Sequence, residues 1–172
     1  MQDPEIEQSM KQSAFNGLCC LLLALTLGCS GSQIANEGQL GPGFKLESLD
    51  GTWVSSDSFK GEALVLNFWA TWCGPCLREI PELKTLAAES NVQIVGIALD
   101  KNGAKAVKPF VERHGINYTI LLGNDEVFQE FDGFGIPHTV VLDASYRVVK
   151  MYRGPVTRGA LEQDLRSIAQ GI

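Results

Sequence analysis

The chain has 172 residues, a formal net charge of −6 and 45% hydrophobic residues, which fits one domain with a sizeable buried core. Its 14 lysine and arginine residues form no cluster along the sequence. This argues against the basic surface that nucleic-acid binding requires, so we expect no nucleic acid among the partners.

The first thirty residues have the pattern of an export signal. The apolar run from Leu18 to Ser30, LCCLLLALTLGCS, is too short to span a bilayer and has the length of a signal-peptide core. The stretch before it starts with acidic residues, whereas Met10 is followed directly by Lys11. We therefore interpret residues 1–29 as a leader whose true start is Met10.

The end of this run, LTLGC, resembles the lipobox of bacterial lipoproteins, with Gly28 before the cleavage point and Cys29 as the lipidated residue. The family usually has Leu where this chain has Thr26. A plain cleaved signal and an uncleaved anchor are the alternatives, and each of them exports the domain. If Cys29 is acylated, residues 30–43 form a flexible tether and residues 44–172 a domain on the extracytoplasmic side of a bacterial cell envelope.

Past the leader, apolar strand patterns alternate with helical ones. The segment FKLESLDGTWVS alternates on both sides of Asp50-Gly51, which predicts a β-hairpin, and the run Ala63–Trp69 predicts a strand buried on both faces. Thr157 is a plausible N-cap for a last helix. Further strands are predicted at 92–99, 118–122, 138–143 and 146–152, and helices at about 75–90, 104–114 and 125–131. This order predicts an α/β sandwich with a mixed sheet.

The five cysteines are unevenly distributed, because only Cys73 and Cys76 lie outside the N-terminal region. Cys73 stands at a strand-to-helix junction, and Pro75 suits the first helical turn. Free N–H groups and the helix dipole stabilise a thiolate at Cys73. The spacing of three brings both sulfurs within bonding reach. We therefore expect Cys73 to be the exposed attacking thiol and Cys76 the sheltered resolving thiol.

Two other interpretations of this pair find less support. A zinc site needs two more soft ligands, but His114 and His138 are isolated and no second cysteine pair follows. If the two thiols were inert and buried, a Gly-Pro pair between them at the start of a helix would be a coincidence. We expect a redox dithiol that uses no metal and no cofactor.

The segment FWATWCGPC resembles the active site of the thioredoxin superfamily. The order of elements, with an additional helix and strand before GIPHTVVLD, resembles the TlpA/ResA branch of exported thiol-disulfide oxidoreductases from about Gly41 onward. The resemblance implies a thioredoxin-like three-layer sandwich with a mixed central sheet, an N-terminal β-hairpin and an inserted helix-strand unit.

The same resemblance implies that Pro137 is a cis-proline facing the cysteine pair, and that the backbone of Ile136 binds an extended substrate segment. Xaa-Pro is the one bond at which the cis form costs little; the alternative is a proline that opens a strand. We expect His138 on the strand surface, with an approach to the site as the alternative. Trp72, adjacent to Cys73, is expected to shield the thiol or contact a partner, with plain packing as the alternative.

Thioredoxin has an aspartate where this chain has Asn67, and asparagine cannot accept the proton of the resolving cysteine. Glu79 offers a substitute, because it lies three residues after Cys76 on the inward helix face that Leu83 continues. An inward glutamate has a raised pKa, suited to proton transfer near neutral pH. The TlpA/ResA branch carries a glutamate at this place. The alternative is a solvated helix glutamate.

CGPC is the sequence of the reducing thioredoxins, so the leading hypothesis is an exported, membrane-tethered reductase of protein disulfides. The resemblance implies apocytochrome c or other envelope proteins as clients and a membrane thiol transporter of the DsbD/CcdA type as electron donor. An oxidase or isomerase, a thiol peroxidase and a copper or haem chaperone remain alternatives.

Overall fold

The computed structural model describes residues 34–90 and 92–171. The chain divides into two units between residues 32 and 33, and every described residue belongs to the second. The leader and Cys29 lie outside the described residues. In the described part, no helix combines the length and the apolar character needed to cross a membrane.

Residues 34–43 of the expected tether are part of the domain. Ala35 is buried, and its N–H donates to the Glu130 carbonyl at 2.7 Å. Leu40 forms a β-bridge with Arg147, and a Cβ at Gly41 would lie 2.7 Å from the side chain of Leu142. The prediction of a flexible tether up to residue 43 is therefore wrong for residues 34–43.

Most predicted elements are present within a few residues of the expected bounds. The first two strands form the predicted hairpin, and a short 3-10 helix that sequence patterns did not indicate follows it. The strands are β1 (Lys45–Ser48), β2 (Trp53–Ser55), β3 (Leu64–Trp69), β4 (Gln93–Ala98), β5 (Thr119–Leu122), β6 (His138–Leu142) and β7 (Val148–Arg153). The helices are η1 (Ser56–Phe59), α2 (Gly74–Glu89), α3 (Ala104–His114), α4 (Asp125–Glu130) and α5 (Arg158–Gln170).

One mixed sheet holds all seven strands in the order β2-β1-β5-β4-β3-β6-β7. The three central strands β3, β4 and β5 are parallel, and the others pair antiparallel to their neighbours. In the centre of the sheet, Asn67 of β3 lies between Gly96 of β4 and Thr139 of β6. The residues of β3 are all buried, as its apolar run predicted.

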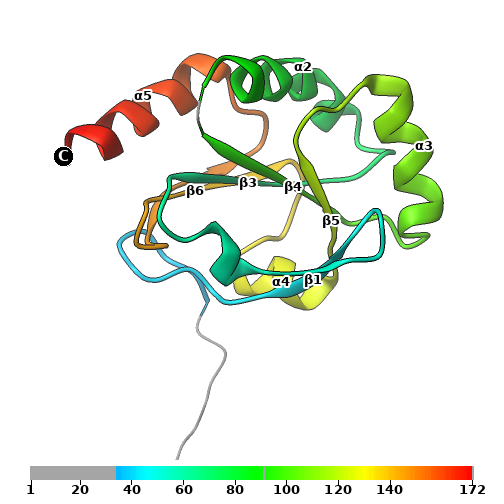
Figure 1. The fold of residues 1–172 in the computed structure, drawn as a ribbon, viewed down its shortest axis with the longest axis horizontal. Helices are drawn as coiled ribbons and strands as arrows, with labels where there is room; N and C mark the ends of the chain where they lie inside the picture. Colours follow the sequence, from blue (N-terminus) through cyan, green and yellow to red (C-terminus); the bar gives the residue numbers. More distant parts are fainter. Residues whose placement is uncertain (1–33, 91, 172) are drawn as a thin grey trace, which may run out of the picture. The chain divides into compact units, whose positions relative to one another are not determined.

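Helices cover both faces of this sheet (Figure 1). On one face, α2, α3 and α5 pack on alternate residues of the central strands, including Val65 and Trp69 of β3. On the other face, α4 and the N-terminal segment pack on Leu66 and Phe68. This three-layer arrangement, with the hairpin and the inserted α3–β5 unit, confirms the predicted fold class.

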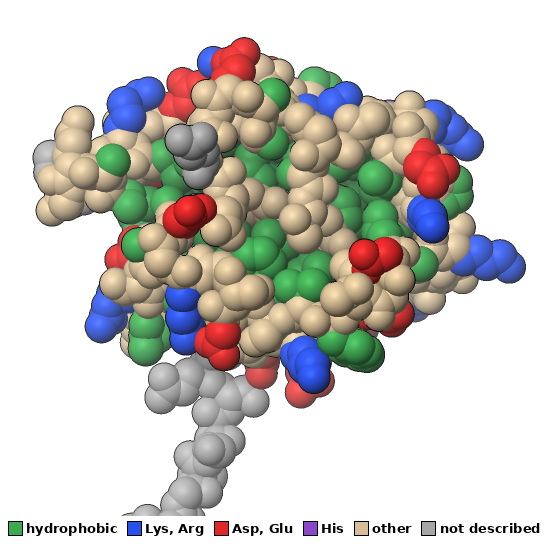
Figure 2. All heavy atoms as spheres, in the orientation of Figure 1, with side chains coloured by type: hydrophobic (Ala, Val, Ile, Leu, Met, Phe, Trp, Pro, Cys, Tyr) green, Lys and Arg blue, Asp and Glu red, His purple; other side chains and the backbone are tan. Residues whose placement is uncertain are grey.

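The charged side chains are dispersed over the face shown in Figure 2. Lysine and arginine side chains stand mostly near its margins and alternate with acidic ones, while apolar side chains are visible between polar ones in the middle. Among the described residues, this face thus carries no large patch of a single charge.

Candidate active site

Cys73 and Cys76 form a disulfide at the start of α2. Cys73 is the N-cap residue, and its sulfur accepts a hydrogen bond from the Cys76 N–H at 3.2 Å. Cys73 keeps 4% of its surface exposed, whereas Cys76 is completely buried. Both cysteines are therefore buried in the oxidised protein, so the expectation that Cys73 is exposed is wrong for this state, although its sulfur lies at the N-terminus of α2.

The turn between β3 and Cys73 is held from the neighbouring strand. Asp100, just past the end of β4, accepts the Thr71 N–H at 3.0 Å and the Thr71 hydroxyl at 2.5 Å. Because β3 and β4 are parallel, their carboxyl ends meet at the same edge of the sheet. Asp100 therefore fixes the segment that presents the cysteine pair.

A second segment adjoins the disulfide from the start of β6. The Ile136–Pro137 bond is cis, as the resemblance implied, and Ile136 packs against the buried cluster that contains both cysteines. The Pro137 carbonyl accepts the Gly154 N–H at 2.9 Å. Trp72 is 70% exposed, so its indole is available for contact beside the disulfide.

The loop ahead of the cis bond is braced at several points. The Arg153 guanidinium pairs with Asp132 and lies 5.6 Å from the centre of the Phe134 ring. A Cβ built at Gly133 would lie 2.1 Å from the Phe128 ring, so this close approach requires glycine. The loop is therefore fixed by packing and charge rather than by regular secondary structure.

Glu79 faces inward, as predicted from its spacing, and is 2% exposed. Its carboxylate accepts one hydrogen bond from Asn67 Nδ2 at 2.6 Å and another from the Val156 N–H at 3.1 Å. Burial raises the pKa of Glu79 to about 7, although both hydrogen bonds act in the opposite direction. The solvated-glutamate alternative is wrong, and the carboxyl can gain or lose a proton near neutral pH.

The expectation that His138 lies on the strand surface is wrong. Its side chain is buried on the α4 face, where Nε2 lies 2.9 Å from the Phe131 carbonyl oxygen. Burial lowers the pKa of His138. Successive side chains of β6 point to opposite faces of the sheet, so His138 lies on the face away from Thr139. This histidine therefore belongs to the core beneath the cis-proline loop.

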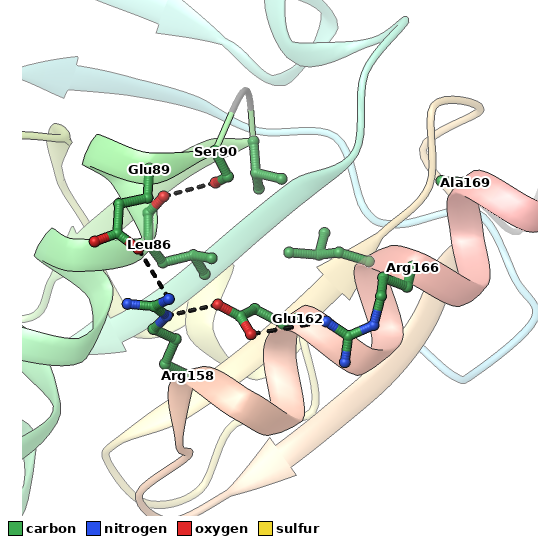
Figure 3. Close-up of a pocket in the computed structure, with 9 residues that line it drawn as sticks. Leu86, Glu89, Ser90, Arg158, Glu162, Arg166 and Ala169 are labelled. Atoms are coloured by element: carbon green, nitrogen blue, oxygen red, sulfur yellow. Dashed lines mark hydrogen bonds and ion pairs between the residues drawn. The ribbon is translucent and has the colours of Figure 1, made fainter.

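A pocket of about 310 Å³ lies between α2 and α5 (Figure 3). It is lined by residues at the C-terminal half of α2, whereas the cysteines are at the other end of this helix. Arg158 in this pocket is held by Glu89 at 2.8 Å and by Glu162 at 2.5 Å. These charges satisfy one another, and we assign no site here.

Among the described residues, no group of three or more His, Cys, Asp or Glu side chains is arranged to hold a metal ion. The arrangement that does support chemistry combines a helix-terminal dithiol, a buried carboxyl and a loop with a cis-proline. Sequence reasoning missed Asp100. Its position directly after the strand that neighbours β3 was the available signal, because parallel neighbours end at the same edge.

Comparisons with known proteins agree with this geometry. The model of the Redoxin family matches residues 36–169. Thioredoxin-like protein YneN of Bacillus subtilis is 31% identical over 133 residues, which is 75% of this chain and 78% of that protein. Thiol-disulfide oxidoreductase ResA of the same species is 29% identical over 146 residues, 83% of this chain and 81% of that protein.

Among solved structures, a thiol:disulfide interchange protein of the thioredoxin family from Chlorobium tepidum TLS superposes with a TM-score of 0.67. The two chains are 31% identical, and the match covers 77% of this chain and 97% of the other. The thioredoxin-like architecture predicted from the sequence is confirmed by this similarity.

Proposed function

The chain belongs to the Redoxin family, and from this membership we propose that it reduces disulfide bonds in client proteins through Cys73 and Cys76. It is a thiol-disulfide oxidoreductase of the kind that its relatives represent. The observation that carries the proposal is the Cys73–Cys76 disulfide at a helix N-terminus, with the buried carboxyl of Glu79 three residues further on.

The proposed reaction begins at Cys73, the cysteine at the N-cap of α2. In the reduced protein, the Cys73 thiolate attacks one sulfur of a client disulfide, and the other client sulfur leaves as a thiolate. The Cys76 thiolate then attacks the Cys73 sulfur of this mixed disulfide. The second client sulfur is then released as a thiol. The client has gained two electrons, and the protein is oxidised to the Cys73–Cys76 disulfide.

In this scheme Glu79 accepts the proton that Cys76 must lose before its attack. A pKa of about 7 lets the carboxyl take up and return a proton at neutral pH. Asn67, which replaces the acid of thioredoxin, donates a hydrogen bond to the Glu79 carboxylate. Asn67 thus acts through Glu79 rather than as a proton acceptor of its own.

Substrate contact is proposed for Trp72, Ile136 and Pro137. Trp72 is exposed beside the outer cysteine, and Ile136 packs on the cluster that holds both cysteines. An extended client segment can lie between them and offer its disulfide to Cys73. The missing N–H of Pro137 leaves space beside the sulfur for the partner.

We further propose that the protein is exported and anchored to a membrane through a lipid on Cys29. The leader pattern of residues 1–29 supports export, and the LTLGC sequence supports the anchor. Because each turnover oxidises the dithiol, a donor must reduce it again, and a membrane thiol transporter of the DsbD/CcdA type would serve. Apocytochrome c and other envelope proteins with exposed thiols are the proposed clients.

The function is tested by trapping clients in the native cell. Cys76→Ser leaves the mixed disulfide on Cys73 unresolved, so client proteins should accumulate as covalent adducts that dithiothreitol releases. Mass spectrometry then identifies them. A cytochrome precursor alone would indicate a dedicated role, and a broad set a general one.

Cys73→Ser provides the matched control. It should capture nothing and should abolish insulin reduction by the purified protein. Turnover that survives in Cys73→Ser would mean that the nucleophile is misassigned. Tight stoichiometric copper binding without insulin reduction by the unaltered protein would favour a copper-binding module instead.

A further inference from the structure

The two most exposed large apolar side chains in the described part of the chain belong to the segments that meet at the disulfide. Phe134 is 79% exposed and Trp72 is 70% exposed. Trp72 directly precedes Cys73, and Phe134 stands two residues before Ile136, which packs against the cluster that contains both cysteines. Single exposed apolar residues are common on protein surfaces, but the position of these two aromatic side chains indicates a role in contact with a partner.

The sheet topology places Phe134 and Trp72 on opposite sides of the disulfide. Cys73 follows β3, and the segment before it is tied to Asp100 at the end of the neighbouring strand β4. On the other side of β3 lie β6 and then β7, and β7 runs in the same direction as β3 because β6 is antiparallel to both. Arg153, the last residue of β7, lies 5.6 Å from the centre of the Phe134 ring. Trp72 therefore flanks the disulfide on the β4 side, and Phe134 flanks it on the β7 side.

The spacing of the strands gives the separation between Phe134 and the cysteine pair. Neighbouring strands lie about 4.8 Å apart, so the end of β7 lies about 10 Å from the end of β3. An extended chain advances about 3.3 Å per residue. A client segment whose cysteine meets Cys73 would thus bring a side chain about three residues away next to the Phe134 ring.

The Phe134 ring is held in place although it is exposed. The Arg153 guanidinium next to the ring also pairs with Asp132, and the Asp132 N–H donates to the Gln129 carbonyl in the last turn of α4 at 2.9 Å. An aromatic ring that is already fixed offers contact area at a low cost in conformational entropy. Because the Arg153 charge is paired with Asp132, the contact that this loop offers to a client is apolar rather than cationic.

We propose that Phe134 is a specificity-determining residue, which contacts an apolar side chain of the client about three residues from the client cysteine. The client segment lies across the disulfide between Trp72 and Phe134. Clients with leucine, isoleucine or an aromatic residue at this distance from a cysteine are reduced faster than clients with a polar residue there. The inference rests on the proposed function, because it concerns which disulfides the protein selects.

Two pairs of synthetic peptides test this preference with the reduced full-length protein. Each peptide carries thionitrobenzoate in disulfide linkage to its single cysteine. The peptides of a pair differ only in having Leu or Ser three residues from the cysteine, on its N-terminal side in one pair and on its C-terminal side in the other. When the Cys73 thiolate attacks the peptide sulfur, thionitrobenzoate leaves as a coloured thiolate, and Cys76 then releases the peptide as a thiol.

We expect the Leu peptide of one pair to react about tenfold faster than its Ser counterpart, because part of the leucine side chain is removed from water against Phe134. Phe134→Ala should reduce this preference to within about twofold. Phe134→Leu should keep most of it, since leucine restores an apolar contact. A preference that survives in Phe134→Ala would overturn the proposal.

Trp53→Ala is the matched control. Trp53 is also an exposed aromatic residue, 61% accessible, but it belongs to β2, which four strands separate from β6. The tenfold preference for the Leu peptide should therefore persist in Trp53→Ala. An equal loss of the preference in Trp53→Ala and Phe134→Ala would contradict a contact at Phe134.

The outcomes separate this inference from the proposed function. Equal rates for the Leu and Ser peptides with the unaltered protein would overturn the role of Phe134 and leave the reductase activity in place. A peptide with Glu at the same position that reacts faster than the Leu peptide would assign recognition to Arg153 instead. If no peptide reacts although the dithiol still reduces dithiobis(nitrobenzoate), the proposed function is itself contradicted, and the selection of clients by Phe134 with it.

Discussion

At the scale of single residues, Glu79 is an acid placed where its charge is costly. Both carboxylate oxygens have a partner, yet burial outweighs those partners and raises the pKa from 4.5 to about 7. The carboxyl is therefore a source of instability whenever it is ionised. Such a cost is common at sites where a group must exchange protons near neutral pH.

This cost predicts how stability depends on pH. Between pH 4.5 and about 7 the folded protein binds more protons at Glu79 than the unfolded chain does, so stability falls as pH rises through this window. The loss contributed by Glu79 amounts to roughly 3 kcal/mol. Urea unfolding of the oxidised protein should show this decline, and Glu79→Gln should remove most of it. Parallel pH dependences in the two proteins would contradict the raised pKa.

Glu79→Gln also predicts a change in the exchange reaction. If Glu79 accepts the Cys76 proton as we propose, resolution of the mixed disulfide in Glu79→Gln should slow by roughly 10²-fold, and the step near neutral pH should disappear from the rate profile. Stopped-flow measurement of client reduction across pH gives both quantities. Asn67→Ala tests the supporting contact, because it keeps the acid but removes its hydrogen bond. Asn67→Ala should therefore shift the change in the rate profile to a higher pKa instead of abolishing it.

At the scale of elements, the β3–α2 turn depends on one side chain from another strand. Asp100→Ala removes both hydrogen bonds to Thr71, which should lower stability by about 1–3 kcal/mol. Because the turn presents Cys73, insulin reduction should also slow several-fold. Thermal unfolding and initial reduction rates measure the two effects.

Asp143→Ala is the control for this change. Asp143 also accepts two hydrogen bonds, from the Ser145 and Arg147 N–H groups, in the turn between β6 and β7. A comparable loss of stability is expected, but the reduction rate should stay normal. Equal loss of activity in both variants would mean that Asp100 matters only for overall stability.

The loop before β6 makes a second prediction at this scale. Gly133→Ala would place a methyl group 2.1 Å from the Phe128 ring, which also contacts Phe68 and His138. The ring must move, so stability should fall by about 1–3 kcal/mol, and client reduction should slow because this loop leads to Ile136–Pro137.

Gly135→Ala serves as the comparison, since a Cβ at Gly135 meets nothing within 4 Å. We therefore expect Gly133→Ala to unfold at a clearly lower temperature than Gly135→Ala in calorimetry. If Gly133→Ala is as stable as Gly135→Ala, the loop is looser than its packing implies.

At the scale of the whole molecule, patterns between neighbours in sequence predicted most of what is observed. The apolar run of β3, the helix after Cys73 and the inward side of Glu79 depend on local periodicity. The role of Asp100 and the burial of His138 depend on contacts between segments 20 or more residues apart, or on which face of a strand meets a helix. Single-sequence patterns do not contain that information.

The same scale includes the leader, for which we predict attachment to a membrane. Cells grown with a labelled fatty acid should incorporate the label into this protein, and Cys29→Ala should lose both the label and the membrane association. Cys73→Ala is the control for general effects of removing a cysteine and should keep the label. An unlabelled protein that still exports would point to a plain cleaved signal.

The hydrogen bond from the Val156 N–H to Glu79 joins residues 77 positions apart. An amide proton shared with a carboxylate senses the charge on that oxygen, so the Val156 resonance in a ¹H–¹⁵N spectrum should shift as Glu79 titrates. The connection ahead of the last helix then acts as a built-in reporter. It would allow the protonation of the redox site to be followed during turnover without a probe at the site itself.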